Sequence, residues 1–216
     1  MRPYVLIVFL FSVVFGYSQP KSSDRFVTVS GQQFMREGVP YYYIGTNFWY
    51  GSVLASKGQG GDRKRLKREL NCMKKLGIRN LRILVGAEEG SKNVTSLSPY
   101  LLHNGQLNDT LLDGLDYLIR ELGRRDMTAV LYLTNSWDWS GGFGYYLKQT
   151  GHGDSPDASG DGYNDYCRYA AQFYTDANAM QMYLSHVRNI VSRTNRYTKR
   201  AYRDEPAIMA WQLCNE

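Results

Sequence analysis

The chain has 216 residues, a net charge of +6 and an aromatic content of 14%. Its cysteines, Cys72, Cys167 and Cys214, form neither a disulfide framework nor a metal-ligand spacing, so we expect buried or half-buried thiols and neither a metal nor a cofactor. Much of the positive charge lies between residues 188 and 203, where a solvated helix end accounts for it. No nucleic-acid-binding module accompanies these basic residues, so a nucleic-acid partner is not expected.

The first 18 residues have the layout of a secretory signal peptide. Met1-Arg2 is a basic start, residues 4–15 are almost continuously apolar, and the small residues Gly16 and Ser18 flank a cleavage point before Gln19. The apolar run is short for a membrane span, and an uncleaved N-terminal anchor is the alternative. We therefore expect residues 19–216 to be the mature part, secreted or periplasmic/extracellular, with no membrane span after signal cleavage.

The mature part is expected to begin with a β-hairpin and then to alternate strands with helices. Residues 26–29 and 32–35 pair across the turn at Ser30-Gly31. The elements that follow are strand 41–47, helix 62–77, strand 78–85, helix 108–123, strand 128–134, helix 175–191 and strand 207–213. The strands at 41–47 and 207–213 are apolar enough to be buried. The residues between 135 and 174 are expected to form a long loop.

Capping residues and apolar spacing support the three helices. Their expected N-caps are Asp62, then Asn108 or Asp109, and Thr175. Gly77 and Gly123 end the first two. The expected apolar faces consist of Leu66, Leu70, Met73 and Leu76 in the first helix, Leu111, Leu115, Leu118 and Leu122 in the second, and Ala179, Tyr183, Val187, Ile190 and Val191 in the third.

Strict alternation of strands and helices indicates a mostly parallel sheet, which is either open and doubly wound or closed into a (β/α)8 barrel. The first strand-to-helix loop, residues 47–52, has no glycine-rich phosphate-binding motif. Polar and aromatic residues cluster at the C-terminal ends of the strands, where a barrel builds its active site. A whole TIM barrel needs roughly 250 residues. We therefore expect only about the first four βα units, preceded by the N-terminal hairpin.

Each strand end contributes candidate site residues. The candidates for substrate binding are Asn47, Trp49 and Tyr50 after the first strand and Asn135, Trp137 and Trp139 after the third. The candidates for catalysis are Arg82 in the second strand and Asn215 and Glu216 after the fourth. Glu216 is the candidate proton donor, because a carboxyl held out of bulk water at a strand end can have a raised pKa. An accidental position in an ordinary loop is the alternative for Asn215 and Glu216, and a structural ion pair is the alternative for Arg82.

Aromatic residues after the third strand are candidates for stacking on a pyranose ring. In an extended segment Trp137 and Trp139 would point to opposite sides, so only one is expected to face a cleft, and Trp137 is preferred. The long loop that follows combines glycine-rich turns with aromatic residues at 141–146 and 160–163. Loops of this length tend to be functional, although a surface excursion without ligand contact is an equal alternative.

Five stretches in order resemble glycoside hydrolase family 5, within the clan of retaining glycosidases on (β/α)8 barrels, and in particular its endo-β-1,4-mannanases. They are Phe26-Val27-Thr28-Val29-Ser30-Gly31, Tyr43-Ile44-Gly45-Thr46-Asn47-Phe48-Trp49-Tyr50, Leu115-Asp116-Tyr117, Thr134-Asn135-Ser136-Trp137-Asp138-Trp139-Ser140-Gly141-Gly142 and Trp211-Gln212-Leu213-Cys214-Asn215-Glu216. The resemblance implies that residues 19–216 are the N-terminal half of a truncated catalytic domain. β-Mannan is then the implied substrate, and the full-length protein is expected to be a monomer.

The resemblance also implies roles for three residues. Glu216 corresponds to the general acid/base, Asn215 to the amide at the sugar 2-hydroxyl, and Arg82 to the arginine that keeps the nucleophile ionised. The nucleophile would lie on the seventh barrel strand, and this sequence offers no candidate for it, so the chain alone is expected to be inactive. A cellulase or another β-1,4-glycanase of the same fold remains an alternative, as does a non-catalytic carbohydrate-binding relative. A cytosolic nucleotide-dependent enzyme is disfavoured by the signal segment and by the missing glycine-rich loop.

Overall fold

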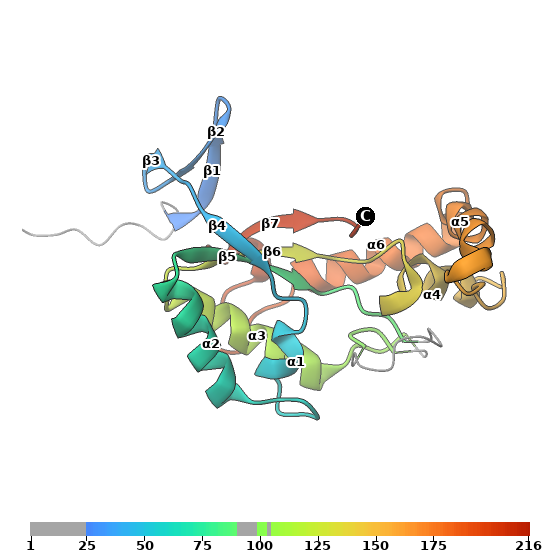
Figure 1. Ribbon diagram of the computed structural model, residues 1–216, viewed down its shortest axis with the longest axis horizontal. Coiled ribbons are helices and arrows are strands. Elements are labelled where there is room, and N and C mark those ends of the chain that lie inside the picture. The colour runs from blue at the N-terminus through green and yellow to red at the C-terminus, as the bar shows by residue number, and fades with distance from the viewer. Residues whose placement is uncertain (1–24, 90–98, 103–104) are drawn as a thin grey trace, which may run out of the picture.

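A computed structural model describes residues 25–89, 99–102 and 105–216 (Figure 1). The proposed signal peptide lies outside these residues. The chain first forms an antiparallel sheet of β1 (Val27–Ser30), β2 (Gln33–Arg36) and β3 (Val39–Pro40), which extends the expected hairpin by one short strand. In Figure 1 this sheet projects from the rest of the molecule. Tyr41 connects it to the main sheet, because its hydroxyl lies 3.2 Å from Thr128 Oγ1.

The main sheet is parallel, and its strands lie in chain order. It consists of β4 (Ile44–Asn47), β5 (Ile78–Leu84), β6 (Thr128–Tyr132) and β7 (Ile208–Gln212). The helices are α1 (Gly51–Ala55), α2 (Arg63–Lys75), α3 (Asp109–Gly123), α4 (Gly142–Gln149), α5 (Tyr163–Ala171) and α6 (Ala177–Val191). The alternation of strands and helices predicted from the sequence is confirmed, and α1, α4 and α5 are additional.

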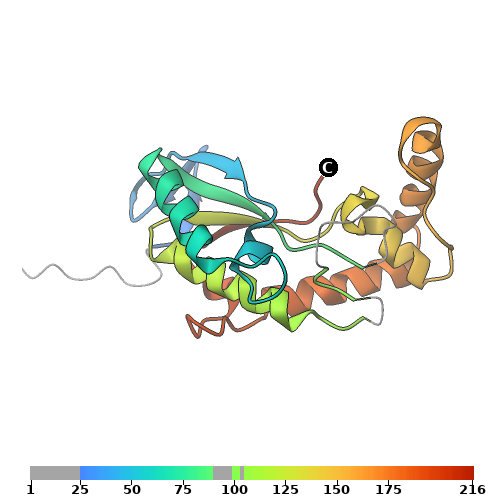
Figure 2. The same cartoon turned by 60° about the horizontal axis from the view of Figure 1, so that its bottom comes forward.

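Helices cover one face of the parallel sheet, and the core lies between the two layers (Figures 1 and 2). Leu81, Ile83 and Leu131 are fully buried on the helix side of the strands. The expected face of α3 packs against them, since Leu115 and Leu118 are also fully buried. Along β5 the alternate residue Arg82 points to the other face, because successive side chains of a strand alternate. That face carries the candidate site.

The three long helices begin at side chains that cap them. Asp62 accepts hydrogen bonds from the backbone N–H groups of the first turn of α2, and Asn108 accepts one from α3. The third cap is Asp176 and not the expected Thr175, because the Asp176 carboxylate accepts from two N–H groups of α6. Leu76 was expected on the buried face of α2 but is 70% exposed, since the helix ends at Lys75 and Leu76 leaves the helical register.

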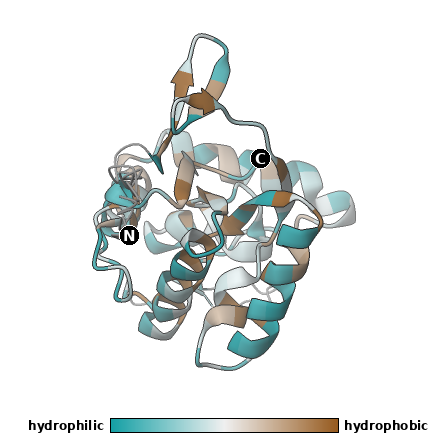
Figure 3. Cartoon of the chain, turned by 90° about the vertical axis from the view of Figure 1, so that its left-hand side faces the viewer, coloured by the Kyte–Doolittle hydropathy of each residue, from teal (hydrophilic) through white to brown (hydrophobic). Residues whose placement is uncertain are grey.

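The two edge strands are more exposed than the sequence predicts. Tyr42 and Ile44 are 78% and 62% exposed, and of β7 only Ile208 is buried. In the described part of the chain β4 pairs with β5 alone and β7 with β6 alone, so apolar side chains at both edges lack a neighbouring strand. Figure 3 shows further hydrophobic segments in the projecting N-terminal sheet. No helix within the described ranges is long and apolar enough to cross a membrane.

Candidate active site

Arg82 lies at the centre of a hydrogen-bonded chain near the C-terminal ends of the parallel strands. Its Nε donates to Gln212 Oε1 at 2.9 Å, and its Nη2 donates to Asn215 Oδ1 at 2.7 Å. The guanidinium carbon also lies 4.2 Å from the centre of the Tyr132 ring, close enough for a cation–π contact. The three contacts fix the orientation of the guanidinium. Arg82 and Asn215, expected to act together, are therefore brought together.

Asn215 and Asn135 join two strand ends through their amides. Asn215 Nδ2 donates to Asn135 Oδ1 at 3.1 Å, and Asn135 Nδ2 donates to Ser140 Oγ at 3.2 Å. Asn135 is fully buried, whereas the sequence suggested that it contacts a saccharide. Because its amide oxygen and nitrogen are both bonded within the protein, Asn135 supports Asn215 and offers no surface to a ligand.

Glu216 is exposed, which differs from the sheltered position expected of a proton donor. It directly follows Asn215, which is 7% exposed, so its backbone is attached to the buried chain of amides. The described residues do not provide that shelter at Glu216.

The candidate residues at the end of β4 and directly after it contact different parts of the molecule. Asn47 is the register partner of Arg82, and it is exposed at the strand end. Trp49 is 41% exposed. Tyr50, however, donates its hydroxyl to Glu69 Oε2 of α2 at 3.2 Å, so its proton is engaged within the protein. Burial raises the pKa of Tyr50, and the neighbouring Glu69 carboxylate adds to the effect.

Trp137 and Trp139 do not lie in an extended segment, because residues 138–140 form a single 3₁₀ turn. The argument from alternation therefore does not apply to them. Trp137 is half-buried and stacks on Tyr166 of α5, with ring centres 5.6 Å apart and planes 11° apart. It also lines a mostly apolar pocket of about 210 Å³ together with Phe143 and Tyr174. Trp139 is 37% exposed.

The long connection between β6 and α6 is mainly helical, whereas the sequence suggested a loop. It contains α4 and α5, and the aromatic residues Phe143, Tyr145 and Tyr146 of α4 are buried. Phe143 stacks on Phe173 with ring centres 4.0 Å apart. These rings belong to the buried core of the described residues and are not exposed as saccharide platforms. The exposed aromatic residues of this region are Trp139, Tyr163 and Tyr174, at 37%, 49% and 68% exposure.

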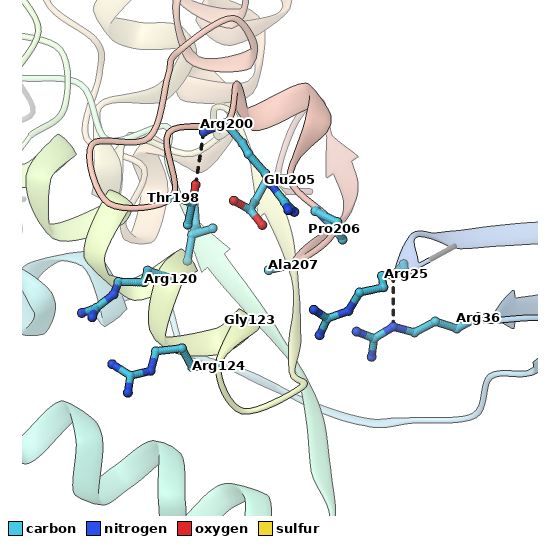
Figure 4. A pocket seen from close by; sticks show the side chains of 11 residues that line it. Arg25, Arg36, Arg120, Gly123, Arg124, Thr198, Arg200, Glu205, Pro206 and Ala207 are labelled. Carbon is cyan, nitrogen blue, oxygen red and sulfur yellow. Dashed lines mark hydrogen bonds between the residues drawn. The ribbon is translucent and has the colours of Figure 1, made fainter. Parts of the chain in front are cut away.

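Five arginines line a pocket of about 340 Å³ at the opposite, N-terminal end of the strands (Figure 4). They are Arg25, Arg36, Arg120, Arg124 and Arg200. Part of their charge is compensated nearby, because Arg36 pairs with Asp126 at 2.8 Å and Arg120 pairs with Glu121 at 3.2 Å. These two arginines of the pocket therefore take part in structural ion pairs.

The cysteines and the potential metal ligands do not form a second functional site within the described ranges. Cys72 and Cys167 are free and exposed, which differs from the buried positions expected, and Cys214 is half-buried. Cys72 lies on the polar face of α2, where nothing packs over it. The residues that the structure describes contain no group of three histidine, cysteine, aspartate or glutamate side chains placed to hold a metal ion.

Comparison with known proteins identifies the family. The family described as GH family 5 beta-mannosidase-like matches residues 24–216. The chain belongs to this glycoside hydrolase family. Mannan endo-1,4-beta-mannosidase 1 of Arabidopsis thaliana is 29% identical over 191 residues, which are 88% of this chain and 41% of the plant protein. The chain thus spans less than half the length of that curated relative.

Solved structures of the same glycoside hydrolase family have the same fold. A family 5 mannosidase from Rhizomucor miehei superposes with a TM-score of 0.84 and 35% identity, over 91% of this chain and 50% of the fungal chain. Another structure of that mannosidase, also with a TM-score of 0.84, holds mannosyl-fructose. The endo-1,4-beta-mannanase of the same fungus gives 0.70 and 26%, over 88% and 48% of the two chains. The parallel sheet with its helices is therefore part of a (β/α) barrel.

Sequence reasoning missed three residues at this end of the glycoside hydrolase sheet. Gln212 and Tyr132 contact Arg82, and the register of the sheet pairs them with each other. Strand alternation could have found both. Arg82 is in register with Val130 of β6, and Val130 is in register with Ala210 of β7. Tyr132 and Gln212 each lie two residues further along their strands and therefore on the same face as Arg82. Glu88 is the third, a fully buried carboxyl after β5. No periodicity marks Glu88, since it lies outside the strands.

Proposed function

We propose that the whole protein is a secreted glycoside hydrolase that cleaves β-1,4-mannosidic bonds in mannans. Family membership and the mannan-degrading relatives support the substrate class. The observation that carries the proposal is the contact of Arg82 with Asn215 at 2.7 Å, directly before Glu216 and at the end of the sheet where barrels perform chemistry. The signal-like first 18 residues support secretion.

The proposed mechanism is a retaining double displacement. Such a reaction needs two carboxyl groups about 5–5.5 Å apart, one attacking the anomeric carbon and one protonating the leaving oxygen. We assign the proton donor to Glu216, which then removes a proton from water in the second step. The attacking carboxylate is assigned to no residue of this chain.

Arg82 is suited to hold that second carboxylate in its ionised form. Its three contacts are to neutral groups, the amides of Gln212 and Asn215 and the ring of Tyr132. No carboxylate pairs with Arg82 in the described ranges. A nearby uncompensated guanidinium lowers the pKa of a carboxyl and so favours a nucleophile. Asn215, oriented by Asn135, is assigned to the 2-hydroxyl of the sugar.

A mannosidase that acts on short mannosides is the second candidate. The fungal mannosidase matches this chain at 35% identity and a TM-score of 0.84, against 26% and 0.70 for the endo-mannanase of the same fungus. The mannosyl-fructose in the related structure is also a short saccharide. The two candidates share the chemistry and differ in the length of chain that they accept.

The test is hydrolysis by the whole protein, with mannan, cellulose, xylan and a short manno-oligosaccharide assayed side by side. Rapid shortening of mannan supports the endo-acting enzyme, and release of mannose from the oligosaccharide alone supports the mannosidase. Removing a general acid/base costs about 10²–10⁴-fold, so Glu216→Ala should lower kcat to that extent while saccharide binding is retained. Asp204→Ala, an exposed change in the segment before β7, is the control. Equal activity of Glu216→Ala and the unaltered protein would remove Glu216 from the mechanism.

A further inference from the structure

Glu88 is a buried carboxyl that the proposed mechanism does not use. It is 2% exposed, in the segment that follows β5. Oε1 accepts hydrogen bonds from Thr134 Oγ1 and from the Tyr146 hydroxyl, each at 2.9 Å, and Oε2 accepts one from the Gly142 backbone N–H at 2.9 Å. No ion pair of Glu88 occurs in the part of the chain that the structure describes. Three neutral donors therefore hold it.

These donors belong to the segment that leaves β6. Thr134 follows the strand, while Gly142 begins α4 and Tyr146 lies one turn further along it. The residue before the helix is Gly141, which has no side chain that could cap α4. Glu88 supplies the missing acceptor from elsewhere in the chain, at a helix N-terminus where backbone N–H groups lack partners.

The backbone that follows β5 also contacts the backbone that leads into α4. Glu88 N donates to Ser140 O at 2.8 Å. Gly141 and Gly142 have φ values of 90° and 56°. A Cβ at Gly141 would lie 2.3 Å from Glu88 O, and a Cβ at Gly142 would lie 2.3 Å from Asn135 O. Gly141 is therefore needed where the two segments meet, and Gly142 is needed where the chain passes Asn135. The contact at Gly141 brings the carboxyl of Glu88 to its donors.

The clamped segment contains residues of the candidate site. Thr134 O accepts from Asn215 N at 2.9 Å, and the neighbouring Asn135 bonds both the Asn215 amide and Ser140 Oγ. Asn215 in turn contacts Arg82. A shift of residues 134–142 would therefore move the support of Asn215, and it would also move Trp137 and Trp139.

We propose that Glu88 is a positioning residue, which holds residues 134–142 against the end of β5 and so fixes the Asn135–Asn215–Arg82 chain for catalysis. The inference rests on the proposed glycosidase function for its kinetic part. Its structural part, the clamp itself, is independent of the substrate. Glu88 touches none of the reacting groups and acts through Thr134 and α4.

The protonation state of Glu88 sharpens the test. Burial raises its pKa to about 8, against the lowering effect of its three donors. The titratable groups that face it are Tyr145 and Tyr146 of α4, Tyr183 of α6 and Cys214 after β7, and none is a cation. At neutral pH the carboxyl is mainly protonated. Its carbonyl oxygen then accepts from Gly142 N, and its hydroxyl donates to Thr134 or Tyr146, whose hydroxyls can turn.

A glutamine keeps the acceptor for Gly142 N and is uncharged, and the two hydroxyls can turn to accept from its amide nitrogen. In E88Q the amide oxygen faces Gly142 N, and the amide nitrogen donates to the two hydroxyls. The experiment compares E88Q, E88A, Y146F and T134V in the whole protein. Hydrogen exchange of residues 134–142 reports the clamp, and kcat and KM on the best substrate report its effect. Y146F and T134V each remove one donor and keep the assay informative if E88A does not fold.

We expect faster exchange in E88A, and to a smaller degree in Y146F and T134V, with E88Q close to the unaltered protein. A small misplacement of catalytic groups can cost about 10²-fold, so kcat/KM of E88A should fall by that order. E121Q is the matched control, since Glu121 is also buried but pairs with Arg125 in the helical layer. Its exchange at residues 134–142 should not change.

Two outcomes overturn the clamp. One is unchanged exchange at residues 134–142 in E88A, Y146F and T134V. The other is an E88Q protein with intact protection and the low kcat of E88A, because Glu88 would then act through its charge. Failure of the proposed function is distinct, since the unaltered protein would hydrolyse none of the saccharides whatever the exchange data show.

Discussion

Two buried carboxyl groups of this chain are satisfied in opposite ways. Asp116 of α3 is fully buried and is bound by the Arg193 guanidinium through two hydrogen bonds of 3.1 and 2.8 Å, and Tyr202 adds a third at 2.6 Å. Glu88 is equally buried, but all its donors are neutral. The first carboxyl is paired with a cation in the helical layer. The second is easier to hold as a neutral acid beside the candidate site.

The difference shows what each carboxyl can do. A buried ion pair with two parallel hydrogen bonds is directional, so Asp116 fastens the segment after α6 onto α3. A neutral carboxyl keeps both a donor and an acceptor, and it can match hydroxyl and backbone partners without a counter-charge. Held in this way, Glu88 organises residues 134–142 without pairing with Arg82.

The largest expected effect comes from breaking the Asp116 pair. Asp116→Ala leaves the half-buried guanidinium of Arg193 and the buried hydroxyl of Tyr202 without their acceptor. Breaking a buried pair typically costs about 3–5 kcal/mol of unfolding free energy, and the partial exposure of Arg193 places the expected loss near the lower end. Urea unfolding of the whole protein measures it. The double variant Asp116→Ala with Arg193→Met should recover part of the loss. If the double variant is no more stable than the single one, the pair is not coupled.

The pH dependence of stability tests whether Glu88 is held as a neutral acid. Its folded pKa, about 8, is above the ordinary value of 4.5, so the folded protein binds a proton that the unfolded chain has lost between these pH values. This contribution to stability is complete below about pH 4.5 and is lost as the pH rises to about 8, at up to about 1.4 kcal/mol per pH unit. E88Q should be less sensitive to pH over this window. An identical slope in both proteins would contradict the buried neutral acid.

His186 of α6 gives the opposite slope. The side chain is 2% exposed, its ring nitrogens lie near the Val85 backbone but outside hydrogen-bonding geometry, and burial lowers its pKa to about 4. The unfolded chain therefore binds the extra proton between about pH 4 and 6.5. Stability from this group is present above pH 6.5 and is lost as the pH falls to about 4. His186→Leu should flatten the acid side of the stability profile, as measured by thermal unfolding.

The smallest effect is expected at an exposed pair. Asp165 and Arg168 on α5 form an ion pair, but their side chains are 61% and 73% exposed. Solvent and salt screen such pairs. Asp165→Asn should leave the unfolding midpoint unchanged within error. A large fall in the unfolding midpoint would mean that α5 depends on this pair. The exposure of a carboxylate would then not predict its contribution to stability.

Local sequence signals determined most of the fold. Asp62 and Asn108 cap the helices as expected, and Leu115 and Leu118 bury the expected face of α3. The exposure of Ile44 could not be predicted, because an apolar strand reads the same at an edge as in the middle of a sheet. The helices α4 and α5 were missed since glycines at 141, 142, 144, 160 and 162 suggest turns.

The candidate site was predicted in part. The position of Arg82 and Asn215 at the same edge of the parallel sheet follows from the strand pattern, and the structure brings them into contact across β6. The burial of Asn135 depends on the turn that brings Ser140 back over it, and the strand pattern of the sequence does not predict that turn. Glu88 depends on the contact between two loops, which approach each other closely at Gly141, where a side chain would meet the Glu88 backbone.

The strand order β4-β5-β6-β7 has a consequence for how the chain acquires its structure during synthesis. Each new strand pairs with the one translated just before it, so no later segment has to be inserted between two earlier ones. The crossovers between paired strands are nevertheless long, since Ile44 pairs with Ile78 and Ala129 with Ile208, so each added strand closes a long loop and β7 closes the longest one. Each βα unit can dock on its predecessor as it leaves the ribosome, with β4 serving as the first template.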